Sequence, residues 1–163
     1  MPIWTDPKLS KSVLVRALHD WWMAHCRPCG VPDRGDFDLP EHRLLLPNIL
    51  LGEVEVEPFR IRYRVVGTKI VSNLGVDFTG RYLDELLGPS HTIPWVDFYR
   101  RSFAERRPLM GSVTDPTASG STFDYEFGLF PMTQGGGTAI RQFIALEDYF
   151  DFNLKSGALV GLL

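Results

Sequence analysis

The chain has 163 residues, of which 44% are hydrophobic and 23% are charged. This composition is typical of a globular domain and excludes global disorder. A chain of this length can bury a core without disulfides or metal. The formal net charge of −3 gives no general attraction to nucleic acid or anionic lipid, so neither is expected as a partner. No apolar run approaches the roughly 20 residues that span a bilayer. The N-terminus also lacks a secretory pattern, which together predicts a cytoplasmic protein.

The N-terminal segment predicts an amphipathic helix. Ser10 or Ser12 can cap a helix that runs to about His25. Its broad apolar stripe needs a partner surface. We expect this stripe to pack on a second copy of the chain, making a homodimer through Leu14, Leu18, Trp21 and Trp22.

The segment from Arg27 to Pro47 is dense in Pro, Gly and Asp, which predicts an irregular connector. Its polar residues are expected to anchor the connector through bonds to backbone groups; they are Asp33, Arg34, Asp36 and Asp38.

Cys26 and Cys29 form a C-x2-C pair, which suggests a zinc site completed by nearby histidines or a redox dithiol. The nearby histidines are His19, His25 and His42. A zinc ribbon needs a second pair at set spacing, and a thioredoxin-like pair opens a helix rather than closing one. We therefore favour structural cysteines and predict no metal site.

Two strands joined at Glu57-Pro58 predict a β-hairpin from Asn48 to Gly67. Acidic residues alternate with apolar ones in the first strand, and arginines do so in the second. The two charged rows can therefore share an outer face and form cross-strand ion pairs between Glu53, Glu55, Glu57 and Arg60, Arg62, Arg64.

Helical segments are predicted after the hairpin. Thr68–Leu74 is expected to form a short helix with Gly75 as its left-handed exit, and Thr79 is expected to cap a second helix over Gly80–Leu87. A longer helix is predicted from Thr92 or Pro94 to about Arg107.

The last third predicts three antiparallel strands, which are Leu109–Thr114, Ser121–Met132 and Ala139–Glu147. Gly135 to Gly137 are expected to form the turn before the last strand. The acids Glu147, Asp148 and Asp151 are interpreted as solvated residues at a strand exit.

The motifs themselves resemble a mainly alphaproteobacterial family of stand-alone, single-domain PAS proteins. The likeness covers about Trp21 to Glu147, and it rests on VPDRGDFDLP, LLLPNILLGEVE, FRIRYRVVGT and GVDFTGRYLDEL. It implies an α+β fold with a five-stranded antiparallel sheet of order 2-1-5-4-3, helices on one face and an N-terminal helical extension. We expect the helix and connector over residues 1–46, the PAS-like domain over 47–148 and a C-terminal tail over 149–163.

The resemblance also implies a small-molecule cavity between sheet and helices in some members. Bulky side chains with a few polar tips would line it, namely Tyr63, Val65, Ile70, Leu74, Trp95, Phe98, Tyr99, Tyr125, Phe127 and Phe143. The alternative is that these side chains fill one another as an ordinary core.

The cofactor stays unknown at this level. A flavin photosensor of the PAS type uses a cysteine within the fold, whereas Cys26 and Cys29 precede it. A haem ligand is expected on the longer helix, and His91 lies just before its start, where a surface or capping role is the simpler interpretation.

Three functions remain open. The first is a non-catalytic PAS-type signalling module that binds a small molecule, a downstream partner protein, or both. The second is an interaction or dimerisation module without a ligand. The third is a small enzyme with a curved-sheet cavity, which would need an interior Asp-His pair that the sequence does not place.

Overall fold

A six-stranded antiparallel sheet forms the centre of the protein in a computed structural model that describes residues 1–87, 93–116 and 122–151. The strand order is β1-β4-β5-β6-β2-β3. The strands are β1 (Ile3–Trp4), β2 (Ile49–Val56), β3 (Phe59–Val66), β4 (Leu109–Pro116), β5 (Thr122–Met132) and β6 (Gln142–Asp151). The helices are α1 (Val13–Ala24), α2 (Thr68–Leu74), α3 (Leu83–Leu86) and α4 (Trp95–Glu105). From β2 to β6 the predicted α+β fold and strand order are confirmed.

The edge strand β1 has no counterpart in the sequence prediction. It pairs with β4 through Ile3 opposite Gly111 and Trp4 opposite Met110. Two residues are too few to show the alternation that identifies a strand, so only the paired structure reveals it.

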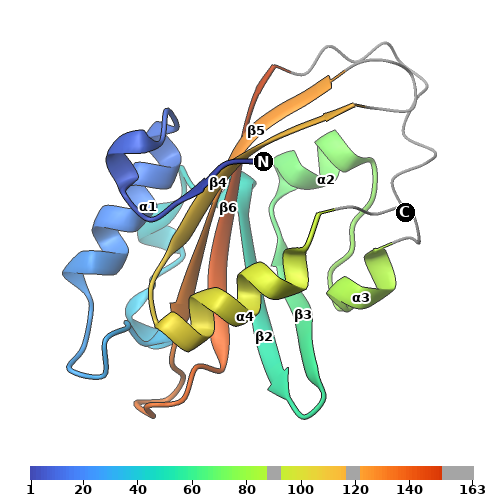
Figure 1. Ribbon diagram of the computed structural model, residues 1–163. Coiled ribbons are helices and arrows are strands. Elements are labelled where there is room, and N and C mark those ends of the chain that lie inside the picture. Colours follow the sequence, from blue (N-terminus) through green and yellow to red (C-terminus); the bar gives the residue numbers. More distant parts are fainter. Residues whose placement is uncertain (88–92, 117–121, 152–163) are drawn as a thin grey trace.

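The sheet is covered on both faces (Figure 1). The front face carries Leu50, Leu129 and Phe143 and packs against α2, α3 and α4. The back face carries Leu51, Phe130 and Ile144 and packs against α1 and the connector. Successive residues of a strand point to opposite faces, which is why each strand contributes to both clusters.

Two carboxylates of the back face hold the start of α1. Glu126 accepts hydrogen bonds from the Ser10 hydroxyl and from the backbone N–H groups of Lys11 and Ser12, at 2.5, 3.0 and 2.8 Å. Ser12 is the N-cap, and its hydroxyl also donates to Asp148 at 2.8 Å. The predicted cap is confirmed, and β5 and β6 fix where the helix begins.

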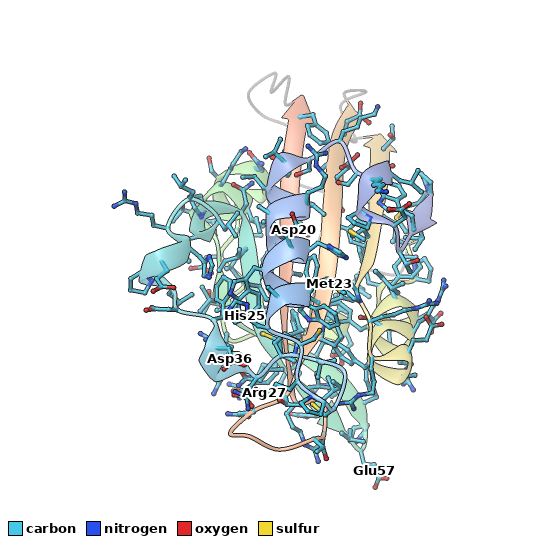
Figure 2. All side chains as sticks on the ribbon, turned by 90° about the vertical axis from the view of Figure 1, so that its left-hand side faces the viewer. Asp20, Met23, His25, Arg27, Asp36 and Glu57 are labelled. Carbon is cyan, nitrogen blue, oxygen red and sulfur yellow. The ribbon has the colours of Figure 1, made fainter. Side chains whose placement is uncertain are left out.

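The connector is anchored by Asp33, as predicted. Its carboxylate accepts hydrogen bonds from Gly35 N–H, Gly136 N–H and the Thr133 hydroxyl, at 2.9, 2.9 and 3.0 Å. Burial raises the pKa of Asp33, but these three bonds outweigh it, so the pKa is lowered. Asp36 pairs with Arg27 at 2.6 Å, near the lower end of α1 in Figure 2. The connector is thus fastened to the β5–β6 hairpin.

The predicted helix over Gly80–Leu87 is shorter than expected and begins at Leu83. Thr79 is not its cap, because the Thr79 N–H and hydroxyl both donate to Asp77. Gly80 and Arg81 instead exchange backbone hydrogen bonds with Tyr63, at 2.8 and 3.0 Å. This segment therefore covers the exposed edge of β3, where a free strand would invite unwanted pairing.

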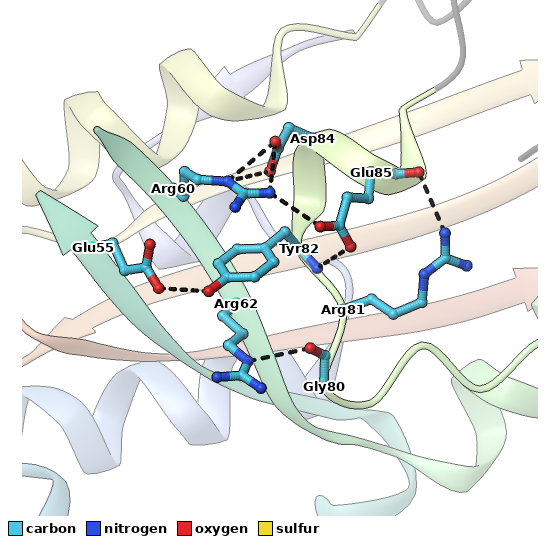
Figure 3. Close-up of polar contacts among 8 residues, drawn as sticks. All are labelled: Glu55, Arg60, Arg62, Gly80, Arg81, Tyr82, Asp84 and Glu85. Carbon is cyan, nitrogen blue, oxygen red and sulfur yellow. Dashed lines mark hydrogen bonds and ion pairs between the residues drawn. The ribbon is translucent and has the colours of Figure 1, made fainter. Parts of the chain in front are cut away.

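Most of the ion pairs predicted between the glutamates of β2 and the arginines of β3 do not form among the described residues. Arg64 does pair with Glu53, at 3.0 Å. Arg60, however, binds Asp84 and Glu85 of α3, and Arg62 donates to the Gly80 carbonyl (Figure 3). Glu55 instead accepts a hydrogen bond from the Tyr82 hydroxyl at 2.6 Å. The Arg60 guanidinium lies 3.6 Å from the centre of the Tyr82 ring. The hairpin charges thus hold α3 to β3.

The C-terminal strand extends beyond the predicted domain end at residue 148, because β6 continues to Asp151. Residues 152–163 of the predicted tail and His91, the conceivable haem ligand, lie outside the described residues. Within the described parts of the chain, no helix is long and apolar enough to cross a bilayer.

Candidate functional site

The front face gathers most of the aromatic side chains that the sequence analysis singled out. Phe143 is fully buried at its centre, with the Tyr99 ring 4.9 Å and the Tyr63 ring 6.1 Å away. Further along, the Trp95 ring lies 4.9 Å from that of Phe127. Strands β3, β5 and β6 and helix α4 therefore supply one continuous aromatic surface.

Gly52 makes room for this arrangement. It pairs with Phe143 on β6, and a Cβ atom at Gly52 would lie 2.4 Å from Cζ of the Phe143 ring. The same Cβ would lie 2.5 Å from the backbone oxygen of Arg62. The Phe143 ring is thus seated directly over the backbone of β2.

Tyr63 and Tyr99 bring two hydroxyl groups together inside this surface. Their oxygen atoms are 3.4 Å apart, and both side chains are buried. Burial raises the pKa of each phenol well above its usual value, and Glu147 reinforces the rise in both. Both phenols therefore stay protonated at neutral pH and can serve as hydrogen-bond donors or acceptors.

Glu147 lies on the front face of β6, because it alternates with Phe143, Ala145 and Tyr149. It lies opposite Phe127 of β5, and its Oε2 atom accepts a hydrogen bond from the Tyr149 hydroxyl at 2.6 Å. Burial raises the pKa of Glu147 to about 7, since a charged carboxylate loses its hydration there, although the Tyr149 bond partly opposes the rise. Glu147 therefore exchanges its proton near neutral pH.

Asn73 adds a second polar group on the same side. Ile70 and Leu74, three residues before it and one after it on α2, both pack on the front-face cluster. The Nδ2 atom of Asn73 is buried and has no hydrogen-bond partner in the structure described. A buried donor without a partner costs about 1–3 kcal/mol, so it is a natural contact point for a ligand.

Nine of the ten predicted cavity residues lie on or against the front face. Their contacts place Tyr63, Ile70, Leu74, Trp95, Phe98, Tyr99, Tyr125, Phe127 and Phe143 there. Whether they line a ligand cavity or fill one another as a core stays a prediction.

Val65 is the exception and is 40% exposed. A β-bulge explains it, because Leu51 pairs with Val65 while the next residue, Gly52, pairs with Tyr63. Arg64 is the extra residue, and it reverses the alternation so that Val66 faces the cluster in place of Val65. A strict period of two placed Val65 wrongly.

Glu147 and Tyr149 were missed as site residues because the last strand was predicted to end at Glu147. In the structure β6 runs four residues further, and the alternation Phe143, Ala145, Glu147, Tyr149 places all four on the front face. The interpretation of Glu147 as a solvated strand exit is therefore wrong. A longer reading of the same alternation would have found it.

The predicted dimer stripe turns out to be divided. Leu18 and Trp22 are buried against the back face of their own chain, and the Trp22 indole donates to the Pro131 carbonyl at 2.8 Å. These two side chains are therefore unavailable to a second copy. Leu14 and Trp21 are only partly buried, and their role in a dimer stays a prediction.

The cysteines follow α1 beside the back face. Cys26 is exposed, Cys29 is partly buried, and both are free thiols. Among the described residues no three His, Cys, Asp or Glu side chains gather in a way that could hold a metal ion. Burial and the neighbouring Cys29 raise the pKa of Cys26, which disfavours a reactive thiolate.

The solved structures with a similar arrangement include light-oxygen-voltage (LOV) domains. One, studied with a flavin analogue, is 15% identical with a TM-score of 0.51, covering 69% of this chain and 84% of that chain. The Rhodobacter sphaeroides LOV protein is 15% identical with a TM-score of 0.48, covering 72% and 70%. The light-state LOV domain of the blue-light photoreceptor Aureochrome1 is 15% identical with a TM-score of 0.47, covering 69% and 88%. At sequence identities this low, the similarity shows the fold alone.

No curated protein matches the chain. A family model described as the PAS domain matches residues 10–146, which include α1, the connector, the strands from β2 to β5 and the first half of β6. The match thus takes in the N-terminal helix and most of the front-face aromatic residues, and it ends one residue before Glu147. The chain belongs to the PAS domain family.

Proposed function

We propose that this protein is a non-catalytic PAS-type sensory module that binds a small molecule at the front face and signals to a partner protein. The observation that carries the proposal is a pair of half-buried polar residues, Glu147 and Asn73, on an aromatic surface. A core without a binding role is more stable when such positions are apolar. A ligand that bonded to these groups would offset their cost.

A binding role is favoured over catalysis by the chemistry of the neighbouring phenols. Tyr63, Tyr99 and Tyr149 all have raised pKa values, chiefly because they are buried, so they hold their protons at neutral pH. Phenols of this kind are poor general bases. They are well suited to hydrogen-bonding a bound molecule.

A cysteinyl-flavin photosensor mechanism does not fit this chain. Such chemistry needs a thiol beside the ligand, and the two cysteines of the sequence, Cys26 and Cys29, both lie in the turn after α1, beside the back face.

An interaction module without a ligand is the second candidate. Large apolar side chains are exposed around α1, among them Leu9 at 62%, Val13 at 65% and Met23 at 54%. Light scattering on the purified protein tests whether a homodimer forms. Loss of that dimer in Val13→Asp with Met23→Asp would support this candidate.

Native mass spectrometry tests the ligand proposal. Protein purified from its own host should carry or acquire a small molecule, and that molecule should raise the melting temperature. Tyr63→Leu or Tyr125→Leu should reduce this increase while the variants still fold. Tyr82→Leu is the matched control, because Tyr82 bonds to Glu55 on the hairpin and not to the front face. Equal stabilisation of Tyr63→Leu, Tyr125→Leu and wild type would argue against the site.

A further inference from the structure

We propose that the front-face ligand is an arylalkylamine whose protonated nitrogen binds the carboxylate of Glu147. The proposal rests on the proposed function and names the chemical class of the ligand. It follows from three observations: a carboxylate oxygen of Glu147 lacks a hydrogen-bond donor, no cation among the described residues pairs with Glu147, and aromatic rings lie beside it.

The carboxylate of Glu147 can accept a further hydrogen bond. Its Oε2 atom accepts the bond from Tyr149, while no hydrogen bond from the described residues reaches Oε1. An ionised carboxylate accepts up to about four hydrogen bonds. An ammonium group carries three donors and is therefore a fitting complement for the oxygen that remains.

No cation of the described residues faces Glu147. On α2, Lys69 approaches Asp148 at 3.8 Å. On α4, the guanidinium of Arg100 lies over the Phe59 ring at 4.5 Å, and Arg101 pairs with Glu105 at 3.1 Å.

The remaining charged neighbours point elsewhere. Arg60, on β3, pairs with the α3 acids Asp84 and Glu85, and the β5 acid Glu126 faces α1. The charge of Glu147 is thus uncompensated within the described part of the protein. A half-buried carboxylate without a cationic partner favours either a proton or an external cation.

The rings around the site favour an aryl group on the same ligand. Phe127 lies directly across from Glu147 on β5, and Trp95 packs against the Phe127 ring at 4.9 Å. Aromatic faces stabilise both a neighbouring ring and an ammonium group. The free Nδ2 of Asn73 can in addition donate to a hydroxyl on the ligand ring.

Proton linkage provides a signature for this contact. Because burial raises the pKa of Glu147 to about 7, the group is largely protonated at pH 6 and largely ionised at pH 8. An ammonium ligand requires the ionised form. Binding at pH 6 must therefore release a proton, and affinity must rise with pH.

Isothermal titration calorimetry with three matched probes tests the proposal. Tyramine carries the amine, 4-hydroxyphenylethanol is its neutral analogue, and 3-(4-hydroxyphenyl)propionate is its anionic analogue. At pH 8 tyramine should bind at least about tenfold more tightly than either analogue. At pH 6 its affinity should fall several-fold, and buffers of different ionisation enthalpy should reveal proton release.

Glu147→Gln is the decisive variant, because glutamine keeps the bond from Tyr149 and removes the charge. It should fold, bind the neutral probe as wild type does, and lose the preference for tyramine. Unchanged tyramine affinity in Glu147→Gln would overturn the proposal.

The two levels of inference can fail separately. Equal or tighter binding of the neutral or anionic probe, weakened by Tyr63→Leu, would overturn the amine class and leave the ligand-binding function standing. If no probe binds and native mass spectrometry finds no other small molecule, both proposals fail.

Discussion

The guanidinium of Arg106 donates its Nε–H to the backbone carbonyl of Cys29 at 2.8 Å, joining the end of α4 to the turn that follows α1. Its Nη2 atom donates to the Thr138 carbonyl, also at 2.8 Å. Arg106 ends α4 in the left-handed region with a φ of 53°, which costs a residue other than glycine roughly 1–2 kcal/mol. Its side chain offsets this cost by linking three separate segments.

Arg106→Ala should lower the free energy of unfolding by about 1–3 kcal/mol, because it loses both hydrogen bonds and keeps the backbone strain. Arg106→Gly loses the same bonds but relieves the strain, so it should be less destabilising by about 1 kcal/mol. Urea denaturation of the two variants measures the difference. A glycine variant less stable than the alanine variant would contradict this account of α4.

The stability of the protein should depend on pH through Glu147. Its pKa is about 7 in the folded state, above the ordinary value of 4.5, so the folded state binds more protons between these values. The free energy of unfolding should therefore decline as pH rises from about 4.5 to 7, by roughly 2–3 kcal/mol from this group alone. Glu147→Gln should remove this contribution and be more stable than wild type at pH 8. Denaturation curves of both proteins at pH 5 and pH 8 provide the check, and parallel pH dependence would exclude Glu147 as its source.

Gly52→Ala should disturb the centre of the front face. Its Cβ would meet the Phe143 ring at 2.4 Å and the Arg62 backbone oxygen at 2.5 Å, and the backbone atom cannot move aside cheaply. Overpacking of this kind costs about 1–3 kcal/mol or more. Gly137→Ala is the control, since its nearest contact would be 3.4 Å away, at the Gln134 oxygen. Near-ultraviolet circular dichroism should change for Gly52→Ala and stay unchanged for Gly137→Ala.

Leu18→Ala should destabilise the monomer itself. Leu18 is fully buried against the back face, so removing its side chain should cost about 2–5 kcal/mol. Val13→Ala lies on the same helix, but Val13 is 65% exposed, and the change should be within about 0.5 kcal/mol. Both can be measured by thermal and urea unfolding at several protein concentrations. A loss in Leu18→Ala that appeared only at high concentration would point to a dimer contact instead.

Local patterns predicted the individual elements well. Ser12, Gly75 and the alternation of β3 each act within a few residues, so capping, left-handed exit and strand could be recognised from neighbours in sequence. The strand order came from the family resemblance, since sequence periodicity carries no information on which strands adjoin.

Contacts between distant residues were beyond such patterns. The bulge at Arg64 depends on the pairing of two strands, and it moved Val65 out of the site. Arg60 forms its ion pair with Asp84, 24 residues away in the sequence, and not with the glutamates of the adjacent strand. The destination of α1 was likewise undetermined, because an apolar helix face suits a partner subunit or the chain's own sheet equally well.

Consecutive residues of β6 serve the two sides of the sheet. Glu147 lies on the front face between Ala145 and Tyr149, while Asp148 accepts a hydrogen bond from the Ser12 hydroxyl at the start of α1. One peptide bond therefore separates a group that titrates near neutrality from the group that fixes an N-terminal helix. The backbone of β6 therefore fixes the spacing between the titrating front-face carboxyl and the residue that holds the N-cap of α1.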